Sequence, residues 1–241
     1  MKNILVALSL LLFVSCAKHD SNVSSISITD DEIKERIVKS YPNISISDIK
    51  KIDDYLYEII INKQIYYATS DGKYLIVGNI INLDTKESIT ENTKMRQRVS
   101  TIKLINESDM IVYRPKKTDH VLTIFTDSSC PYCQKLHDEV NNLVDNNVEV
   151  RYVLFSRNGN EVEAYTQLVS AWCADERKEA VEEIFSGNLL DENLSCSNPI
   201  AKNYEYASIL SVEGTPTIFL EDGRVIPGYQ GYREILAIIN K

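Results

Sequence analysis

Two cysteines in the sequence CPYC, Cys130 and Cys133, have the type and spacing for redox chemistry. They stand where an apolar run at residues 120–127 ends and a helical pattern over residues 130–145 begins. A thiol at the start of a helix faces free backbone N–H groups and the positive end of the helix dipole, which favour the thiolate. We therefore predict that Cys130 is an ionised nucleophile. Cys133 lies one turn further along and is predicted to be more buried and to attack a mixed disulfide.

Three other kinds of site could explain the CxxC spacing. A structural disulfide over so short a span would be strained. A zinc site would need two more ligands, but Cys173 and Cys196 are separated by 22 residues and neither belongs to a second CxxC. A c-type haem would need a histidine at position 134, where Gln134 stands. The sequence therefore predicts no metal and no cofactor, and we interpret His137 as a helix-surface residue rather than a base.

The amino terminus has the pattern of an export signal. Lys2 precedes an apolar run at residues 4–14, which at eleven residues is shorter than the roughly 20 that a membrane-spanning helix needs. Cys16 follows in a context similar to a bacterial lipobox, although Phe13 departs from its usual Leu. We predict a signal peptide at residues 1–15, lipidation of Cys16 and a flexible tether at residues 16–27. Simple secretion is the alternative.

The net charge and the predicted export of the chain narrow the functions and the cysteine chemistry that it can have. The chain has 26 basic and 35 acidic side chains, a net charge of −9, which argues against nucleic-acid binding. Disulfides persist outside the cytosol, so the four cysteines after Cys16 can form two pairs. Cys173 and Cys196 lack the setting of a reactive thiolate. We interpret them as a buried structural pair.

A small α+β module is predicted at residues 28–84. Thr29 and Glu32 fit a capping box before a helix that Pro42 ends, and strands are predicted at residues 55–61, 64–69 and 74–83, with turns at Asn62-Lys63 and Asp71-Gly72. An open sheet in so small a module leaves an edge and apolar surface to be covered, so we predict self-pairing into a dimer. Residues 85–111 are predicted to form an exposed linker helix.

Strand and helix signals alternate over residues 112–241, which predicts an α/β domain with a helical insertion. The predicted strands are residues 120–127, 148–155, 217–220 and 225–229, and the predicted helices are residues 130–145, 160–174, 177–185, 199–210 and a last one from Tyr232. The sequence Gly214-Thr215-Pro216 precedes the third of these strands. A plain turn would explain it, but after an upstream CxxC it resembles the cis-proline loop of thioredoxin folds, which would place the Thr215 backbone beside Cys130.

These motifs together resemble the bacterial periplasmic thiol:disulfide interchange proteins of the DsbC/DsbG type, members of the thioredoxin superfamily. The matching segments are Phe125-Thr126-Asp127, Cys130-Pro131-Tyr132-Cys133, Lys135-Leu136-His137, Trp172-Cys173, Gly214-Thr215-Pro216 and Val225-Ile226-Pro227-Gly228-Tyr229. The amino-terminal module and the linker helix also occupy the positions of that family's dimerisation domain and hinge. The resemblance thus covers nearly the whole mature chain.

The resemblance implies a V-shaped homodimer in which two active sites face a cleft for misfolded, disulfide-containing exported proteins. By position, Cys130 would be the attacking thiol and Cys133 the resolving thiol. Thr215 and Pro216, with Pro131 and Tyr132, would contact substrate, and Cys173 with Cys196 would form the structural disulfide. The family is kept reduced by a membrane electron donor of the DsbD type. The implied location is the periplasm, with lipidated Cys16 as an anchor.

Three features depart from related proteins. Many of these isomerases have Gly where Pro131 stands. The two residues between the active-site cysteines, here Pro131 and Tyr132, tune the redox potential of the pair. A lipid on Cys16 is not the common arrangement. Ile124 occupies the place of a buried Asp in thioredoxins. From the resemblance we expect a disulfide isomerase and reductase. The alternatives are a dithiol oxidase, a reductase of single oxidised (sulfenic-acid) thiols, or mainly a dimeric holdase chaperone.

Overall fold

The computed structural model describes residues 28–159 and 162–241, and it divides into two compact units, one ending at Gly78 and the other beginning at Asn79. The predicted signal peptide, Cys16 and the tether lie outside the described residues. None of the helices in the described ranges is both long and apolar enough to cross a membrane.

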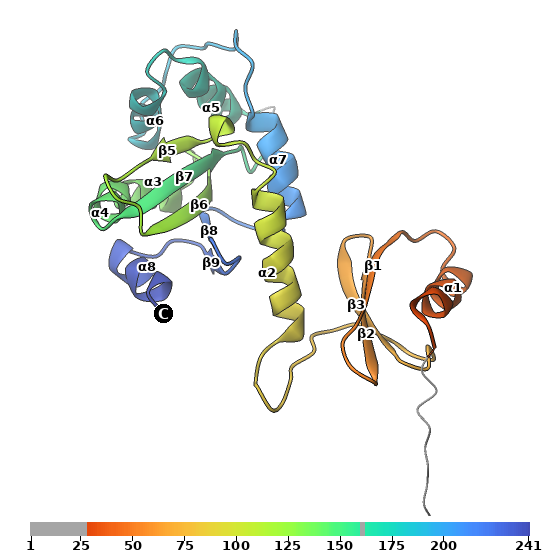
Figure 1. Cartoon of the computed structure of the whole chain (residues 1–241). Helices are drawn as coiled ribbons and strands as arrows, with labels where there is room; N and C mark the ends of the chain where they lie inside the picture. Colours follow the sequence, from red (N-terminus) through yellow and green to blue (C-terminus); the bar gives the residue numbers. More distant parts are fainter. Residues whose placement is uncertain (1–27, 160–161) are drawn as a thin grey trace, which may run out of the picture. The chain divides into compact units, whose positions relative to one another are not determined.

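The first unit is one helix on an antiparallel sheet (Figure 1). Helix α1 covers Asp30–Ser40, and the strands β1 (Ile46–Lys51), β2 (Leu56–Ile61), β3 (Gln64–Thr69) and β4 (Leu75–Ile76) pair in chain order. The predicted capping box is confirmed, because the Thr29 N–H donates to Glu32 Oε2 at 2.8 Å and the Glu32 N–H donates to Thr29 Oγ1 at 3.3 Å. Ile33 and Ile37 of α1 are buried in a core shared with the sheet.

The first unit differs from the sequence prediction in two places. Strand β1 was not predicted, because its residues are polar at most positions and only its pairing with β2 makes it a strand. The predicted strand at residues 74–83 is wrong in extent, since only Leu75 and Ile76 pair with β3. The chain leaves the sheet at Gly78, whose φ is +155°, and the apolar side chains of Val77 and Leu83 are exposed.

The second unit is built on a five-stranded sheet in the order β5-β7-β6-β8-β9. Strands β6 and β7 are parallel and the other pairs are antiparallel. The strands are β5 (Ile111–Tyr113), β6 (His120–Thr126), β7 (Val148–Leu154), β8 (Thr217–Leu220) and β9 (Val225–Pro227). The helices are α2 (Ile89–Ile102), the short η1 (Glu107–Asp109), α3 (Pro131–His137), α4 (Val140–Asp145), α5 (Glu163–Cys173), α6 (Arg177–Phe185), α7 (Ile200–Ile209) and α8 (Tyr232–Ile239). This is the predicted α/β domain with a helical insertion.

Side chains of the central strands alternate between two cores, one on each face of the sheet. Leu122 and Ile124 of β6 pack with α3, α4, α5, α6 and α8, whereas Phe125 of the same strand packs with α7 and the segment after α2. The insertion helices α5 and α6 lie side by side (Figure 1). The sheet is therefore covered on both faces, and Cys130 and Cys133 fall in the first of these two cores.

The predicted helix at residues 130–145 is two helices, α3 and α4, separated at Asp138 and Glu139. The apolar stripe of the sequence continues across this break, with Leu136, Val140 and Leu143 all buried. The stripe therefore identified the buried side of the segment but could not locate the break.

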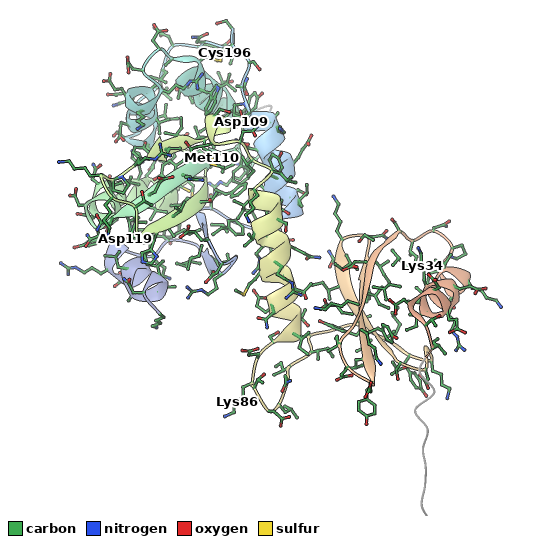
Figure 2. All side chains as sticks on the ribbon, viewed as in Figure 1. Lys34, Lys86, Asp109, Met110, Asp119 and Cys196 are labelled. Atoms are coloured by element: carbon green, nitrogen blue, oxygen red, sulfur yellow. A yellow bond between two sulfur atoms is a disulfide. The ribbon has the colours of Figure 1, made fainter. Side chains whose placement is uncertain are left out.

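Helix α2 lies within the predicted linker region of residues 85–111, and Lys86, labelled in Figure 2, precedes it. The helix packs inside the second unit. Gly223, in the predicted hairpin turn between β8 and β9, has φ +88° and lies so close to α2 that a Cβ atom would come within 2.3 Å of the Met95 carbonyl oxygen. The Arg98 guanidinium donates to the Gly223 carbonyl oxygen at 3.2 Å. Glycine is required here by both its conformation and its closeness to α2.

Candidate active site

Cys130 is the residue that caps the amino terminus of α3, immediately after the turn that follows β6. Its N–H donates to the Asp127 carbonyl oxygen at 3.0 Å, and its own carbonyl oxygen accepts from the Cys133 N–H at 2.9 Å. Pro131 occupies the first helical position, as the sequence predicted, where no N–H is needed. The predicted junction of a buried strand and a helix is therefore confirmed.

The Thr215-Pro216 peptide bond is cis and lies beside this junction. The Cys130 thiol donates to the Thr215 carbonyl oxygen, with 3.3 Å between Sγ and O. Strand β8 begins at Thr217, and its pairing with β6 brings residues far apart in the chain to the same end of the sheet. The predicted placement of the Thr215 backbone next to Cys130 is confirmed.

The surroundings of the two thiols shift their pKa values in opposite directions. Burial acts to raise the pKa of Cys130, but polar groups of the Thr215 side chain, of Cys133 and of the Tyr132 backbone favour the thiolate and lower the pKa. Burial raises the pKa of Cys133 to about 11, although hydrogen bonds with Thr126, Asp127 and Thr215 oppose the change. Cys130 is therefore the better nucleophile near neutral pH, and Cys133 needs help to lose its proton.

Both active-site thiols are free and buried, whereas the side chain between them is exposed. Cys133 is completely covered, and Cys130 retains only 1% of its possible exposure. Tyr132 is 58% exposed. Pro131 and Tyr132 are therefore the exposed residues next to the covered Cys130 thiol.

Asp127 is a site residue whose role the sequence analysis did not identify. Its carboxylate is fully buried and accepts hydrogen bonds from the Ser129 N–H at 2.9 Å, the Ser129 hydroxyl at 2.7 Å and the Arg157 N–H at 3.0 Å. The Arg157 guanidinium lies 3.7 Å away. These bonds hold the turn that presents Cys130. An acidic residue three positions before the CxxC, directly after a buried strand, was the available signal.

The interpretation of His137 as a surface residue is wrong. The side chain is buried, because α6 of the helical insertion and Tyr152 of β7 cover this side of α3. His137 Nε2 lies 2.8 Å from Glu182 Oε2, and Nδ1 lies 3.3 Å from the Tyr152 hydroxyl oxygen. Helical spacing placed His137 on the same face as Cys133 but could not show that the insertion folds back over that face.

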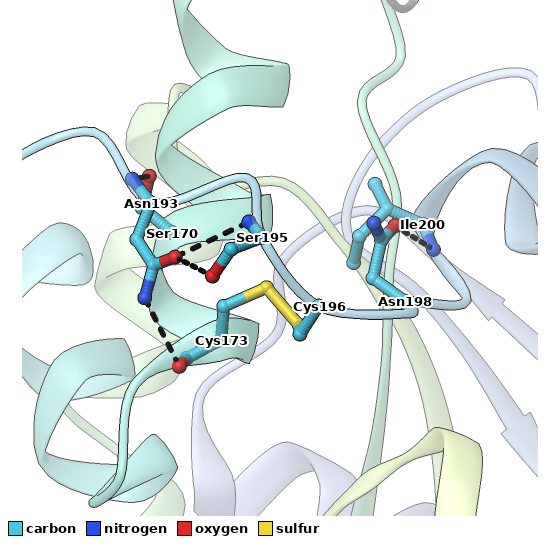
Figure 3. The surroundings of a disulfide bond; sticks show 7 residues. All are labelled: Ser170, Cys173, Asn193, Ser195, Cys196, Asn198 and Ile200. Atoms are coloured by element: carbon cyan, nitrogen blue, oxygen red, sulfur yellow. Dashed lines mark hydrogen bonds between the residues drawn. A yellow bond between two sulfur atoms is a disulfide. The ribbon is translucent and has the colours of Figure 1, made fainter.

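Cys173 and Cys196 form a disulfide with a Cα–Cα distance of 5.6 Å (Figure 3). It joins the end of α5 to the segment that precedes α7. Asn193 strengthens the same connection, since its side-chain amide donates to the Cys173 carbonyl oxygen at 3.3 Å and its N–H donates to Ser170 Oγ at 3.0 Å. Across residues 28–159 and 162–241, the structure contains no group of three or more His, Cys, Asp or Glu side chains arranged to hold a metal ion.

Comparison with known families gives two matches that divide the chain much as the fold does. A thioredoxin-like domain family matches residues 107–241, and the family described as the disulfide bond isomerase protein N-terminal domain matches residues 22–91.

Curated relatives carry the name thiol:disulfide interchange protein DsbC. The Salmonella typhimurium protein is 34% identical over 183 residues, which are 76% of this chain and 76% of that protein. The Escherichia coli K12 protein is 31% identical over 185 residues and covers the same shares. The Haemophilus influenzae protein is 29% identical over 242 residues, 100% of this chain and 99% of that protein.

Solved structures show the same fold for the second unit. A disulfide interchange protein from Neisseria gonorrhoeae has a TM-score of 0.50 at 23% identity, covering 56% of this chain and 96% of that chain. Proteus mirabilis ScsC in a transitional conformation also has a TM-score of 0.50, at 20% identity, covering 63% of this chain and 82% of that chain. At this identity the likeness concerns the fold alone.

Proposed function

Because the chain belongs to the DsbC family of thiol:disulfide interchange proteins, a disulfide isomerase family with a thioredoxin-like fold, we propose that its reaction runs through Cys130 and Cys133. The observation that carries this proposal is the position of Cys130, which caps α3 and lies 3.3 Å from the Thr215 carbonyl oxygen. No other described cysteine is a free thiol apart from Cys133.

The Cys130 thiolate attacks one sulfur of a wrongly formed disulfide in an exported protein. A bond forms between Cys130 Sγ and that sulfur, and the other substrate sulfur leaves as a thiolate. A thiolate of the substrate can then attack the mixed disulfide and leave a rearranged substrate and reduced Cys130. Alternatively Cys133 attacks Cys130 Sγ, which reduces the substrate and oxidises the Cys130–Cys133 pair.

The residues around the thiols fit contact with an extended substrate segment. Thr215 and Pro216 form the turn beside Cys130, and a backbone turn of this kind can pair with a strand of many sequences. Pro131 and Tyr132 form the exposed rim next to the nucleophile. We assign substrate contact to these four residues and a structural role to the Cys173–Cys196 disulfide.

The amino-terminal segments fit an exported homodimer. We assign residues 1–15 to a signal peptide, residues 16–27 to a tether lipidated on Cys16, residues 28–84 to dimerisation and residues 85–111 to a linker before the catalytic domain of residues 112–241. In support, a four-stranded open sheet leaves edges, and the first unit exposes Tyr55, Tyr74 and Val77. The location is the periplasm, and reduction of the active-site pair requires a membrane donor of the DsbD type.

Refolding of a scrambled multi-disulfide protein in glutathione buffer tests the proposed function. The purified mature protein is expected to restore native pairing, and Cys130→Ser is expected to remove this activity. Failure of the unaltered protein to unscramble the substrate, or full activity of the variant, would contradict the proposal. Sedimentation of the same protein tests the dimer.

Pro131 keeps a dithiol oxidase as the second candidate function, because many related isomerases have Gly at this position and the two residues between the thiols tune the redox potential in either direction. The equilibrium redox potential of the Cys130–Cys133 pair decides between an isomerase and an oxidase. A value near the roughly −180 mV of protein disulfide isomerase supports isomerase activity, and a value nearer −120 mV with rapid oxidation of reduced substrates supports the oxidase.

A further inference from the structure

A pocket of about 500 Å³ lies beside the cis-proline turn and has no role in the chemistry described above. The residues that line it belong to the segment after β7, residues 155–158, and to the end of α7 with the loop that follows, residues 204–214. Its volume is within the range of pockets that bind ligands. A second pocket, of about 230 Å³, lies at the opposite end of the sheet, where β6 begins and β8 ends. The larger pocket is thus at the end of the sheet that carries Cys130.

The larger pocket offers apolar surface between exposed polar groups. Phe155 and Ala207 line it and are buried in the second core, against which Val212 also packs. Tyr204 lines it too, with its ring centroid 6.3 Å from that of Phe155, and is 44% exposed. The polar lining residues are all exposed, namely Arg157, Asn158, Ser208, Ser211 and Glu213. This arrangement suits an apolar side chain whose own backbone remains in water.

Two lining residues connect this pocket to the nucleophile. Gly214 directly precedes Thr215, whose carbonyl oxygen lies 3.3 Å from Cys130 Sγ. The Arg157 N–H donates at 3.0 Å to the Asp127 carboxylate, which also holds the turn before Cys130. Because successive Cα atoms are about 3.8 Å apart, the pocket begins about one residue from the turn that contacts the nucleophile.

A substrate segment bound at Cys130 reaches the pocket within a few residues. Each residue of an extended segment advances about 3.3 Å, and successive side chains point to opposite sides. A segment that pairs with the Thr215 backbone runs along the turn in which Gly214 is the next residue. A side chain up to three residues from the substrate cysteine is therefore the one that meets the pocket.

We propose that this pocket holds a large apolar side chain, aromatic or branched aliphatic, of the substrate segment whose cysteine reacts with Cys130. This inference rests on the proposed function and names the kind of substrate segment that the site takes. Large apolar side chains are mostly buried in correctly folded proteins. The pocket therefore favours a disulfide that stands next to an exposed apolar side chain, as in a misfolded protein.

Peptides whose single cysteine is a mixed disulfide with 2-nitro-5-thiobenzoate test the pocket. Cys130 Sγ of the reduced protein forms a bond with the peptide sulfur, and nitrothiobenzoate, the better leaving group, leaves as a coloured thiolate. The reference peptide has serine and glycine around the cysteine. Each of the other peptides has phenylalanine at one position, up to three residues away on either side. Rates at rising peptide concentration give the maximal rate and the half-saturating concentration.

Variants of α7 show whether the pocket is the cause of any preference. Ser208→Trp fills the pocket from an exposed position, and Tyr204→Ala removes the half-exposed ring. Ala201→Trp is the matched control, because Ala201 is an exposed small residue of the same helix and does not line the pocket.

Phenylalanine at one or two of these positions is expected to lower the half-saturating concentration at least about tenfold, because burial of an aromatic side chain contributes more than a tenfold change in binding requires. Ser208→Trp should abolish this gain, Tyr204→Ala should reduce it and Ala201→Trp should retain it. No gain at any position, an equal gain at every position, or a gain that Ser208→Trp retains would overturn the assignment of the pocket. Absence of coloured thiolate from every peptide, the reference included, would instead contradict the proposed function, and the inference with it.

Discussion

The two cysteine pairs of the second unit differ in redox state and in surroundings, and the difference follows from their positions in the fold. Cys130 caps a helix next to a cis-proline turn, where polar groups of Thr215, Cys133 and Tyr132 lower its pKa, and its partner is three residues away on the same helix. Cys173 and Cys196 join the end of α5 to an irregular segment, are separated by 23 positions and are oxidised. In the proposed function the first pair exchanges disulfides, whereas the second pair is an oxidised cross-link between α5 and the segment before α7.

Substitution of the nucleophile should give the largest difference in activity between variants of the two cysteine pairs. Cys130→Ser should lower isomerase activity by more than about a thousandfold, as removal of a catalytic nucleophile does elsewhere. The double variant Cys173→Ser with Cys196→Ser should keep activity at a temperature where it remains folded. Scrambled-substrate refolding measures both, and loss of activity in a folded double variant would show that the second pair takes part in exchange.

The thiolate fractions of Cys130 and Cys133 should differ by at least about a hundredfold at pH 7. The pKa of Cys133, about 11, lies two units above the ordinary value of 9.0, while that of Cys130 lies below it, and each unit is a factor of ten in thiolate. Iodoacetamide alkylation of Cys133→Ser and Cys130→Ser as a function of pH reports the two thiols separately. The rate for Cys130 should level off below pH 9, and the rate for Cys133 should still rise above it. Equal profiles would contradict the assignment of roles.

Removing the Cys173–Cys196 disulfide should cost about 3 kcal/mol of unfolding free energy, because a closed loop of this length restricts the unfolded chain. Denaturant unfolding of the double serine variant, with the oxidised protein as reference, measures the loss. A change below about 1 kcal/mol would mean that the contacts of Asn193 already hold the insertion in place.

Asp127→Asn should have the smallest of these effects, roughly 1–3 kcal/mol, because the amide leaves part of a buried hydrogen-bond set unpaired. Slower alkylation of Cys130 should accompany the lost stability, since Asp127 holds the turn that presents it. Asp145→Asn, an exposed carboxylate at the end of α4, is the control and should change neither quantity. Normal alkylation in a destabilised Asp127→Asn variant would restrict the residue to a purely structural role.

The sequence predicted the position of Cys130 in the fold because every determinant of that position is local or is a motif. A buried strand, a CxxC and a helical stripe follow one another directly in the sequence. The Thr215-Pro216 motif is recognisable because it stands directly before a predicted strand. The fold class followed from the alternation of strand and helix patterns for the same reason.

What the sequence did not predict depends on packing between distant segments. His137 carries no local sign of burial, and only the insertion helix α6 with Tyr152 encloses it. Strand β1 is polar at most positions and exists through its pairing with β2, while the strand predicted at residues 74–83 pairs with β3 only at Leu75 and Ile76. Periodicity describes one segment at a time, so it cannot say which neighbour will cover a given face.

Trapping of the mixed disulfide tests the central claim most directly. Cys133→Ala removes the resolving thiol, so incubation with a scrambled multi-disulfide protein, acid quenching and peptide mass spectrometry should find the substrate joined to Cys130. A substrate joined to Cys173 or Cys196, or no covalent adduct at all under conditions where the unaltered protein rearranges the same substrate, would contradict the assignment of exchange to the Cys130–Cys133 pair.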